Sequence, residues 1–180
     1  DHYSSALGGI NTFKFNADGS VLSNPVLLSD DTEKRLENNL ILFYTQQKRD
    51  ASAVLTTQDK ATDQNYSRMT QMRDLVTPLR NVLEAGHNLD EFGQILDKAW
   101  QLKRSLTNDI SSFEIDDYYQ RGIKAGAIGG KILGAGGGGF LLFYVPQNKQ
   151  GAVITSLKDL FNIKIKLDKS GACVRYHDPI

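Results

Sequence analysis

A glycine-rich stretch in the second half of the chain is the feature that most restricts its fold. Residues 126–146 read GAIGGKILGAGGGGFLLFYVP and hold half of the 16 glycines of the chain. Residues without a Cβ atom can adopt positive φ angles and let other groups approach the backbone closely. The apolar run Phe140–Val145 that follows is typical of a buried strand and ends at Pro146. The pattern predicts a short strand at Lys131–Leu133, a glycine loop and a second strand.

The glycine loop matches neither of two common phosphate-binding motifs. Gly134, Gly136 and Gly139 have the spacing of GxGxxG, but that motif opens a helix and a strand follows here. A P-loop would need glycine at Ala125 and serine or threonine at Ile132. A tight hairpin needs only one or two glycines, so a ligand-binding loop explains the run better than a plain turn. Consecutive backbone N–H groups can bind an anion, which makes candidates of Gly134, Ala135, Gly136, Gly137, Gly138 and Gly139.

Composition excludes several classes of protein. The 180 residues are 40% hydrophobic, which suffices for a core. Lysine plus arginine and aspartate plus glutamate number 21 each, so the sequence gives no reason to expect a nucleic-acid partner. Cys173 is the only cysteine, and the three histidines are far apart, so we expect no metal site. No apolar run has transmembrane length and no signal peptide is visible, so we expect a soluble cytoplasmic protein without a membrane partner.

The first residues predict a small unit of their own. Asp1 suits the start of a short helix that Gly8-Gly9 ends. Strands at residues 10–15 and 21–28 then form a hairpin about the turn Asn16–Gly19. A natural chain rarely begins inside such an element, so we expect that an N-terminal portion precedes Asp1.

The rest of the chain predicts an α+β fold. Helices are expected at 31–38, from 51, at 66–85 with a break at Pro78, from the cap Asn88 to 106, from Asp116 or Asp117 to Gly126, and at 151–161; strands are expected at 40–44, 163–167 and 172–176. Met69 and Met72 are expected in the core. Together with the strands around the glycine loop, this order predicts a ferredoxin-like two-layer sandwich with an extended helical insertion.

Two arginines are candidates for binding an anionic substrate. Arg49 follows the strand 40–44, and Arg104 lies in the last turns of the helix that ends near 106. A guanidinium can hold a phosphate through two parallel hydrogen bonds. For Arg104, as for Lys103, a favourable interaction with the helix dipole is an alternative explanation that remains open. For Lys48 a solvated charge cluster explains the residue equally well.

Several segments resemble the GHMP kinases, the superfamily of galactokinase, homoserine kinase, mevalonate kinase and phosphomevalonate kinase. Lys131–Gly139 (KILGAGGGG) resembles their third, glycine-rich motif. Asp1–Gly9 (DHYSSALGG) resembles the segment in which an aspartate precedes a short helix and a Gly-Gly pair. The resemblance is strongest to sugar kinases that act on the anomeric hydroxyl, and it extends to Phe43-Tyr-Thr45 with Arg49, Glu91-Phe-Gly93 and Trp100–Leu106. It covers essentially the whole chain.

The resemblance implies an activity and roles for individual residues. It implies ATP-dependent phosphorylation of the anomeric hydroxyl of a heptose phosphate, in the synthesis of nucleotide-activated heptose, with Mg²⁺ arriving with ATP. Asp1 occupies the position of the catalytic aspartate, which orients or deprotonates the sugar hydroxyl. The Gly134–Gly139 loop lines the phosphate site, and Arg49 and Arg104 are candidates for the sugar phosphate.

The family's first two motifs, including the glycine- and serine-rich phosphate loop, are not found in these residues. We therefore expect 1–28 to be the tail end of an N-terminal kinase domain and 29–180 to be the GHMP kinase C-terminal domain. The missing N-terminal half is then a partner, and the chain alone is expected to be inactive. The oligomeric state is left open. The alternatives are another anomeric sugar kinase such as a fucokinase, whose free sugar needs no phosphate-binding arginines, and a non-catalytic ligand-binding domain of the same fold.

Overall fold

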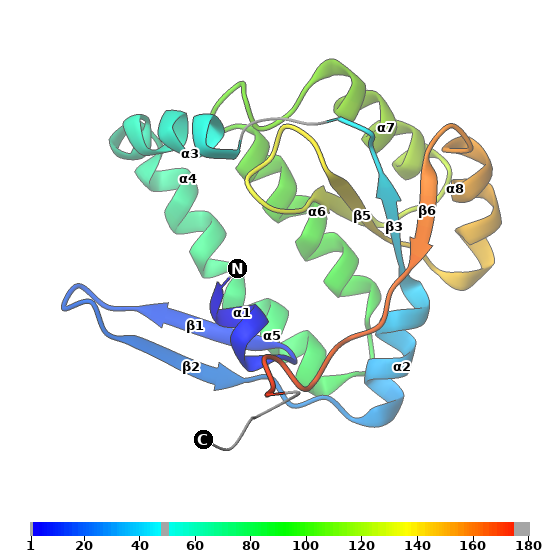
Figure 1. Ribbon diagram of the computed structural model, residues 1–180. Coiled ribbons are helices and arrows are strands. Elements are labelled where there is room, and N and C mark those ends of the chain that lie inside the picture. The colour runs from blue at the N-terminus through cyan, green and yellow to red at the C-terminus, as the bar shows by residue number, and fades with distance from the viewer. Residues whose placement is uncertain (1, 48–50, 175–180) are drawn as a thin grey trace, which may run out of the picture.

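A computed structural model describes residues 2–47 and 51–174 (Figure 1). The structure contains two β-sheets and a set of helices. The elements are α1 (His2–Leu7), β1 (Asn11–Phe15), β2 (Val21–Pro25), α2 (Asp30–Asn39), β3 (Leu40–Tyr44), α3 (Ala51–Lys60), α4 (Thr62–Asp74), α5 (Val76–Ala85), α6 (Asp90–Arg104), α7 (Phe113–Lys124), β4 (Gly129–Ile132), β5 (Phe140–Tyr144), the 3₁₀ turn η1 (Gln147–Lys149), α8 (Gln150–Ser156) and β6 (Phe161–Lys164).

The larger sheet has four antiparallel strands in the order β4-β5-β3-β6. β3 lies beside both β5 and β6, with Leu42 opposite Leu142 on one side and Ile163 on the other. The chain visits the strands as β3, helices, β4, β5, α8, β6, which is the ferredoxin-like arrangement. The predicted α+β class is confirmed. Helices α3 to α7 between β3 and β4 form the helical insertion.

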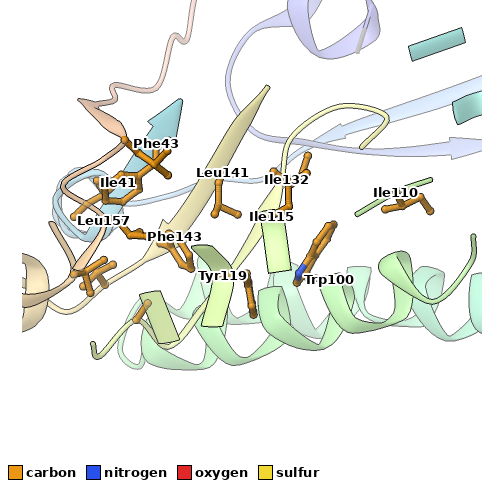
Figure 2. Close-up of a cluster of buried hydrophobic side chains, with 14 of the residues drawn as sticks. Ile41, Phe43, Trp100, Ile110, Ile115, Tyr119, Ile132, Leu141, Phe143 and Leu157 are labelled. Carbon is orange, nitrogen blue, oxygen red and sulfur yellow. The ribbon is translucent and has the colours of Figure 1, made fainter. Parts of the chain in front are cut away.

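The main core lies between this sheet and helices α7 and α8 (Figure 2). The rings of Tyr119 and Phe143 stack with centroids 5.6 Å apart, and Phe43 meets Phe143 edge to face at 6.0 Å. Trp100 reaches the same cluster from α6. Because successive residues of a strand point to opposite faces, Leu141 and Phe143 point into this core, whereas Phe140 and Leu142 lie on the other face.

The second face of the sheet is covered in part. A smaller cluster joins Leu36 of α2 and Leu83 of α5 to Tyr144, with Phe92 of α6 packed against it. Phe140 is 36% exposed and Phe161 is 68% exposed. An apolar part of this face therefore remains open to solvent.

The N-terminal unit is a two-stranded sheet with α1 beside it, at the lower left of Figure 1. As predicted, α1 ends at Gly8-Gly9 and β1 and β2 form a hairpin. The unit joins the C-terminal segment through the Gly9 amide, which donates to the Asp168 carbonyl at 2.6 Å, and the Ala172 amide, which donates to the Ala6 carbonyl at 3.1 Å. The first and last described segments of the chain thus lie side by side.

Several predicted element boundaries are wrong. Helix α7 begins at Phe113 rather than at Asp116 or Asp117, because the Ser112 hydroxyl accepts a hydrogen bond from the Ile115 amide and caps the helix. Asn88 does not cap α6: its side-chain amide donates to Glu91, and Leu89 takes the capping position without a side-chain bond.

The predicted helix 66–85 divides three residues before Pro78. Proline has no N–H and its ring collides with the carbonyl four residues earlier, which belongs to Asp74. Helix α4 therefore ends at Asp74 and α5 begins at Val76. The placement of Met69 in the core is wrong, because its side chain is 43% exposed.

The C-terminal predictions need correction too. Helix α8 ends at Ser156, and β6 comes earlier than the predicted strand 163–167, because Phe161–Lys164 pair with β3. The part of the predicted strand 172–176 that the structure describes, Ala172–Val174, is not a strand, since Ala172 instead bonds to the end of α1.

Candidate active site

The glycine loop connects β4 to β5 and extends from the sheet towards α3, in yellow in Figure 1. Four of its residues have positive φ: 75° at Gly134, 119° at Gly136, 74° at Gly137 and 88° at Gly139. A residue with a Cβ atom rarely adopts such angles. The density of glycine in this stretch is therefore a requirement of the backbone path.

Two backbone amides fix the loop to the body of the protein. The Gly137 amide donates to the Ile110 carbonyl at 2.8 Å, and the Gly139 amide donates to the Gln47 carbonyl at 3.0 Å. A Cβ atom on Gly136 would lie 2.8 Å from the same Ile110 carbonyl oxygen. At Gly136 the loop thus packs directly against the backbone of Ile110, which leaves no room for a side chain at this position.

Three side chains hold carbonyl groups of the loop. The Thr45 hydroxyl donates to the Gly139 carbonyl at 2.8 Å, and the Gln58 amide of α3 donates to the Ala135 carbonyl at 3.3 Å. The Lys103 ammonium of α6 donates to the Gly134 carbonyl at 2.5 Å. The loop is therefore held from three different elements of the fold.

The remaining amides of the loop are open. Those of Gly134, Ala135, Gly136 and Gly138 donate to no atom within the described ranges 2–47 and 51–174. Four of the six predicted loop residues thus have an N–H group available to an acceptor, whereas Gly137 and Gly139 use theirs to hold the loop. Neighbouring backbone N–H groups in a loop can bind an anion where they point to a common position.

Two lysines near the loop, Lys103 and Lys131, were not predicted from the sequence as site residues. Lys131 lies on β4 opposite Leu142, on the face that is only partly covered. Burial lowers the pKa of Lys131, and burial together with repulsion from Lys131 lowers the pKa of Lys103 to about 8. Neither ammonium is within salt-bridge distance of a carboxylate in the described part of the chain. A charged residue in a strand directly before the glycines was the available signal.

The predicted arginines are placed as follows. The Arg104 guanidinium is 2.6 Å from an Asp116 carboxylate oxygen, and the Ser111 hydroxyl donates to the other oxygen of that carboxylate at 2.7 Å. Among the described residues, no hydrogen bond joins Arg104 to the glycine loop. Asp1 and Arg49 lie outside the described residues.

A tyrosine positions the helix that carries Lys103. The Tyr119 hydroxyl of α7 donates to Asp97 of α6 at 2.5 Å. Burial, helped by this bond, raises the pKa of Tyr119, so the hydroxyl stays protonated and keeps donating. A Cβ atom on Gly129 of β4 would collide with the Gly93 carbonyl of α6, so this helix lies directly against the strand.

Other features of the described chain bear on ligands. A cavity of about 360 Å³ adjoins the Gly8-Gly9 turn and is lined also by Val26, Glu33 and Leu167. Within residues 2–47 and 51–174, no group of three or more histidine, cysteine, aspartate or glutamate residues could hold a metal ion. In the same ranges, every helix is too short or too polar to span a membrane.

Part of the chain matches a known family model. Residues 78–163, which include the glycine loop, match the family model described as GHMP kinases C terminal. The D-glycero-alpha-D-manno-heptose 7-phosphate kinase of Campylobacter jejuni is 29% identical over 161 residues, which are 88% of this chain and 47% of that protein. The bifunctional fucokinase/GDP-fucose pyrophosphorylase of Arabidopsis thaliana is 29% identical over 124 residues, 66% of this chain and 11% of that protein.

A solved structure has the same fold. The D-glycero-D-manno-heptose 1-phosphate kinase from Bacteroides thetaiotaomicron superposes with a TM-score of 0.69 at 22% identity, covering 95% of this chain and 46% of that one. The chain thus spans about half the length of the heptose kinases it matches.

Proposed function

We propose that the chain is the C-terminal half of a sugar kinase, because residues 78–163 match the family model described as GHMP kinases C terminal. The reaction is phosphoryl transfer from ATP to the anomeric hydroxyl of a heptose phosphate, for nucleotide-activated heptose in the cytoplasm. The observation that carries the proposal is the glycine loop: within the described residues the amides of Gly134, Ala135, Gly136 and Gly138 donate to no atom, and Lys103 and Lys131 beside them have no carboxylate partner. Residues 1–28 then belong to the N-terminal kinase domain and 29–180 to the C-terminal one.

The proposed mechanism is mostly positioning and charge neutralisation, as phosphoryl transfer requires. The N–H groups of the loop stabilise charge on a phosphate, and Asp1 orients or deprotonates the attacking sugar hydroxyl. Arg49 and Arg104 hold the phosphate of the sugar. Arg104 has five N–H donors, and its contact with Asp116 leaves donors for that purpose.

GHMP kinases use ATP, and we propose that Mg²⁺ arrives with it, because the described residues offer no acidic cluster of their own. When bound, the ion neutralises charge on the nucleotide phosphates. The open loop amides and the two lysines suit an anionic ligand. The N-terminal half of the kinase is the proposed partner that supplies the remaining nucleotide-binding motifs.

A second candidate function is a kinase of a free sugar such as fucose, favoured by the similarity to the bifunctional fucokinase. The two candidates differ in whether the substrate already carries a phosphate. A free sugar gives Arg49 and Arg104 no phosphate to bind.

The test is ATP-dependent ADP release by the complete gene product that contains this chain. Heptose 7-phosphate is compared with free fucose and other free hexoses. We expect turnover on the phosphorylated heptose alone, lost in Asp1→Asn, with a raised KM for the sugar in Arg49→Ala and Arg104→Ala. Turnover on a free sugar only would support a kinase but contradict the proposed roles of Arg49 and Arg104. Unchanged KM values for the sugar in the two arginine variants would also contradict those roles. No turnover on any sugar would favour a non-catalytic domain.

A further inference from the structure

We propose that Lys103 and Lys131 together bind a phosphoryl group of a ligand held at the Gly134–Gly139 loop. This inference deepens the proposed function, since it names the side chains that would hold a phosphate of the substrate or nucleotide. It rests on the placement of the two lysines, on the absence of a carboxylate beside either of them among the described residues, and on the open loop amides.

The fold brings the two lysines to the same end of the loop. Helix α6 runs against β4, from Gly93 beside Gly129 to Lys103 beside Gly134. Lys131 comes three residues before Gly134, on the face of β4 against which α6 packs. Lys131 is close enough to Lys103 for its charge to disfavour the charged form of Lys103.

The arrangement is unfavourable without a ligand. Both lysines are partly buried, and the described part of the chain supplies no carboxylate within salt-bridge distance of either. Among the described residues, the only hydrogen bond of either ammonium is the one that Lys103 donates to the Gly134 carbonyl. A partly buried pair of like charges destabilises the folded state unless an anion lies between them. Such pairs are characteristic of binding sites.

A phosphoryl group fits the donors that are present. An ammonium has three N–H donors, so Lys103 keeps two after its bond to the Gly134 carbonyl, and Lys131 keeps three. The open amides of Gly134, Ala135 and Gly136 add neutral donors at the same end of the loop. A dianion with three acceptor oxygens can use both cations and the amides at once. The phosphate of the sugar and those of the nucleotide share this chemistry.

The first experiment needs no kinase activity. Thermal unfolding of the chain is measured with and without inorganic phosphate, against chloride at equal ionic strength. We expect Lys103→Met and Lys131→Met to raise the Tm without phosphate, because each removes one of two neighbouring, partly buried positive charges. We also expect each to abolish the increase in Tm that phosphate gives the wild type. Lys98→Met is the matched control, since Lys98 is exposed on the same helix and should keep the wild-type increase.

Two arginine variants test whether the positive charge at each position is what binds phosphate. Lys103→Arg and Lys131→Arg retain the positive charge and should retain at least part of the phosphate effect. An increase in Tm that is equal in the wild type and in both methionine variants would overturn the proposal.

The second experiment separates the two sources of phosphate. Binding of heptose 7-phosphate, unphosphorylated heptose and an Mg²⁺–ATP analogue to the complete gene product is measured by calorimetry. Loss of one charge-assisted hydrogen bond should weaken the relevant ligand about 10- to 100-fold in each methionine variant. If the methionine variants bind heptose 7-phosphate more weakly but bind heptose with unchanged affinity, the site holds the sugar phosphate. If they bind the ATP analogue more weakly, the site holds a phosphate of the nucleotide.

Unchanged affinity for all three ligands in both variants would overturn the proposal. If the wild type binds neither sugars nor nucleotide but phosphate still raises its Tm through the two lysines, the proposed kinase function fails and the phosphate site stands.

Discussion

Gly136 illustrates how a single position in the glycine loop excludes any side chain. Its φ of 119° is unfavourable for L-residues, and an added Cβ atom would lie 2.8 Å from the Ile110 carbonyl oxygen. Gly134 also has a positive φ, of 75°, but nothing lies within 4 Å of its Cβ position. A side chain at Gly134 would therefore introduce backbone strain alone, whereas a side chain at Gly136 would introduce both strain and a steric collision.

We predict that Gly136→Ala lowers the free energy of unfolding by about 2–3 kcal/mol, because strain and collision act together. Gly134→Ala is the control and should cost about 1 kcal/mol, from strain alone. Urea unfolding of the three proteins measures both values. Equal losses in the two variants would show that the contact with Ile110 does not restrict the loop.

Lys103 gives a prediction on pH. Its folded pKa is about 8, below the ordinary 10.5, so the folded state releases this proton first. Between pH 8 and 10.5 the unfolded state binds more protons at this site, and the contribution of Lys103 to stability rises with pH.

The expected result is that Lys103→Met is more stable than the wild type at pH 7 and that this advantage shrinks towards pH 10. Taking the difference between the two proteins cancels groups that titrate in both, such as Tyr144, whose pKa burial raises to about 12. Urea unfolding at both pH values gives the difference. An advantage that does not change with pH would mean that Lys103 titrates normally.

At the scale of elements, the contact between α7 and the sheet depends on Gly122. A Cβ atom on this residue would lie 2.5 Å from Cζ of Phe143, whose ring is fully buried and stacked on Tyr119. The close approach brings Tyr119 within reach of Asp97 and so holds α6 in place behind the loop.

Gly122→Ala should therefore destabilise the protein by about 1–3 kcal/mol through overpacking, although alanine is the better helix former. Gly151→Ala in α8 is the matched control, because nothing lies within 4 Å of its Cβ position. It should stabilise by up to about 1 kcal/mol. Thermal unfolding distinguishes the two, and a gain in both variants would contradict the proposed packing.

The elements that the sequence predicts well are those with a strong local signal. Residues 40–44 form a strand as predicted, since five consecutive apolar or aromatic residues bury one face of it fully and the other partly. The start of α7 was missed because Asp116 and Asp117 look like caps, whereas Ser112 makes the capping bond. Strand 172–176 failed because a tertiary contact with α1 takes the Ala172 amide.

The candidate site was only partly predictable for a similar reason. The glycine run predicts a loop, and four positive φ angles confirm its unusual backbone. Which amides stay open depends on Ile110 and Gln47, which are distant in sequence. Lys103 was explained by the helix dipole, and its closeness to Lys131 follows only from the packing of α6 on β4.

At the scale of the whole molecule, apolar side chains of the N-terminal unit are open to solvent. Phe15 is 67% exposed, Leu22 54% and Leu27 74%, as expected for a surface that packs against the N-terminal half of the proposed kinase. We predict that the chain binds an apolar fluorescent dye such as ANS.

Phe15→Ser with Leu22→Ser should lower the dye emission markedly and change the free energy of unfolding by only about 0.5 kcal/mol, since both side chains are exposed. Phe113→Ser is the control, because Phe113 is 85% exposed but lies on α7. Its emission should match the wild type. A monomeric wild type without dye binding would contradict the idea of an open apolar surface.

The pairing of β3 with β5 has a consequence for biosynthesis. Leu40 of β3 pairs with Tyr144 of β5, so β3 leaves the ribosome long before the strand with which it pairs. At ordinary translation rates of about 5–20 residues per second, β5 is synthesised on the order of ten seconds after β3. During this interval the apolar residues of β3 are unpaired while the helices of the insertion emerge and fold locally. Protection of nascent β3, by a chaperone or by those helices, is therefore a requirement that the order of strands imposes on the cell.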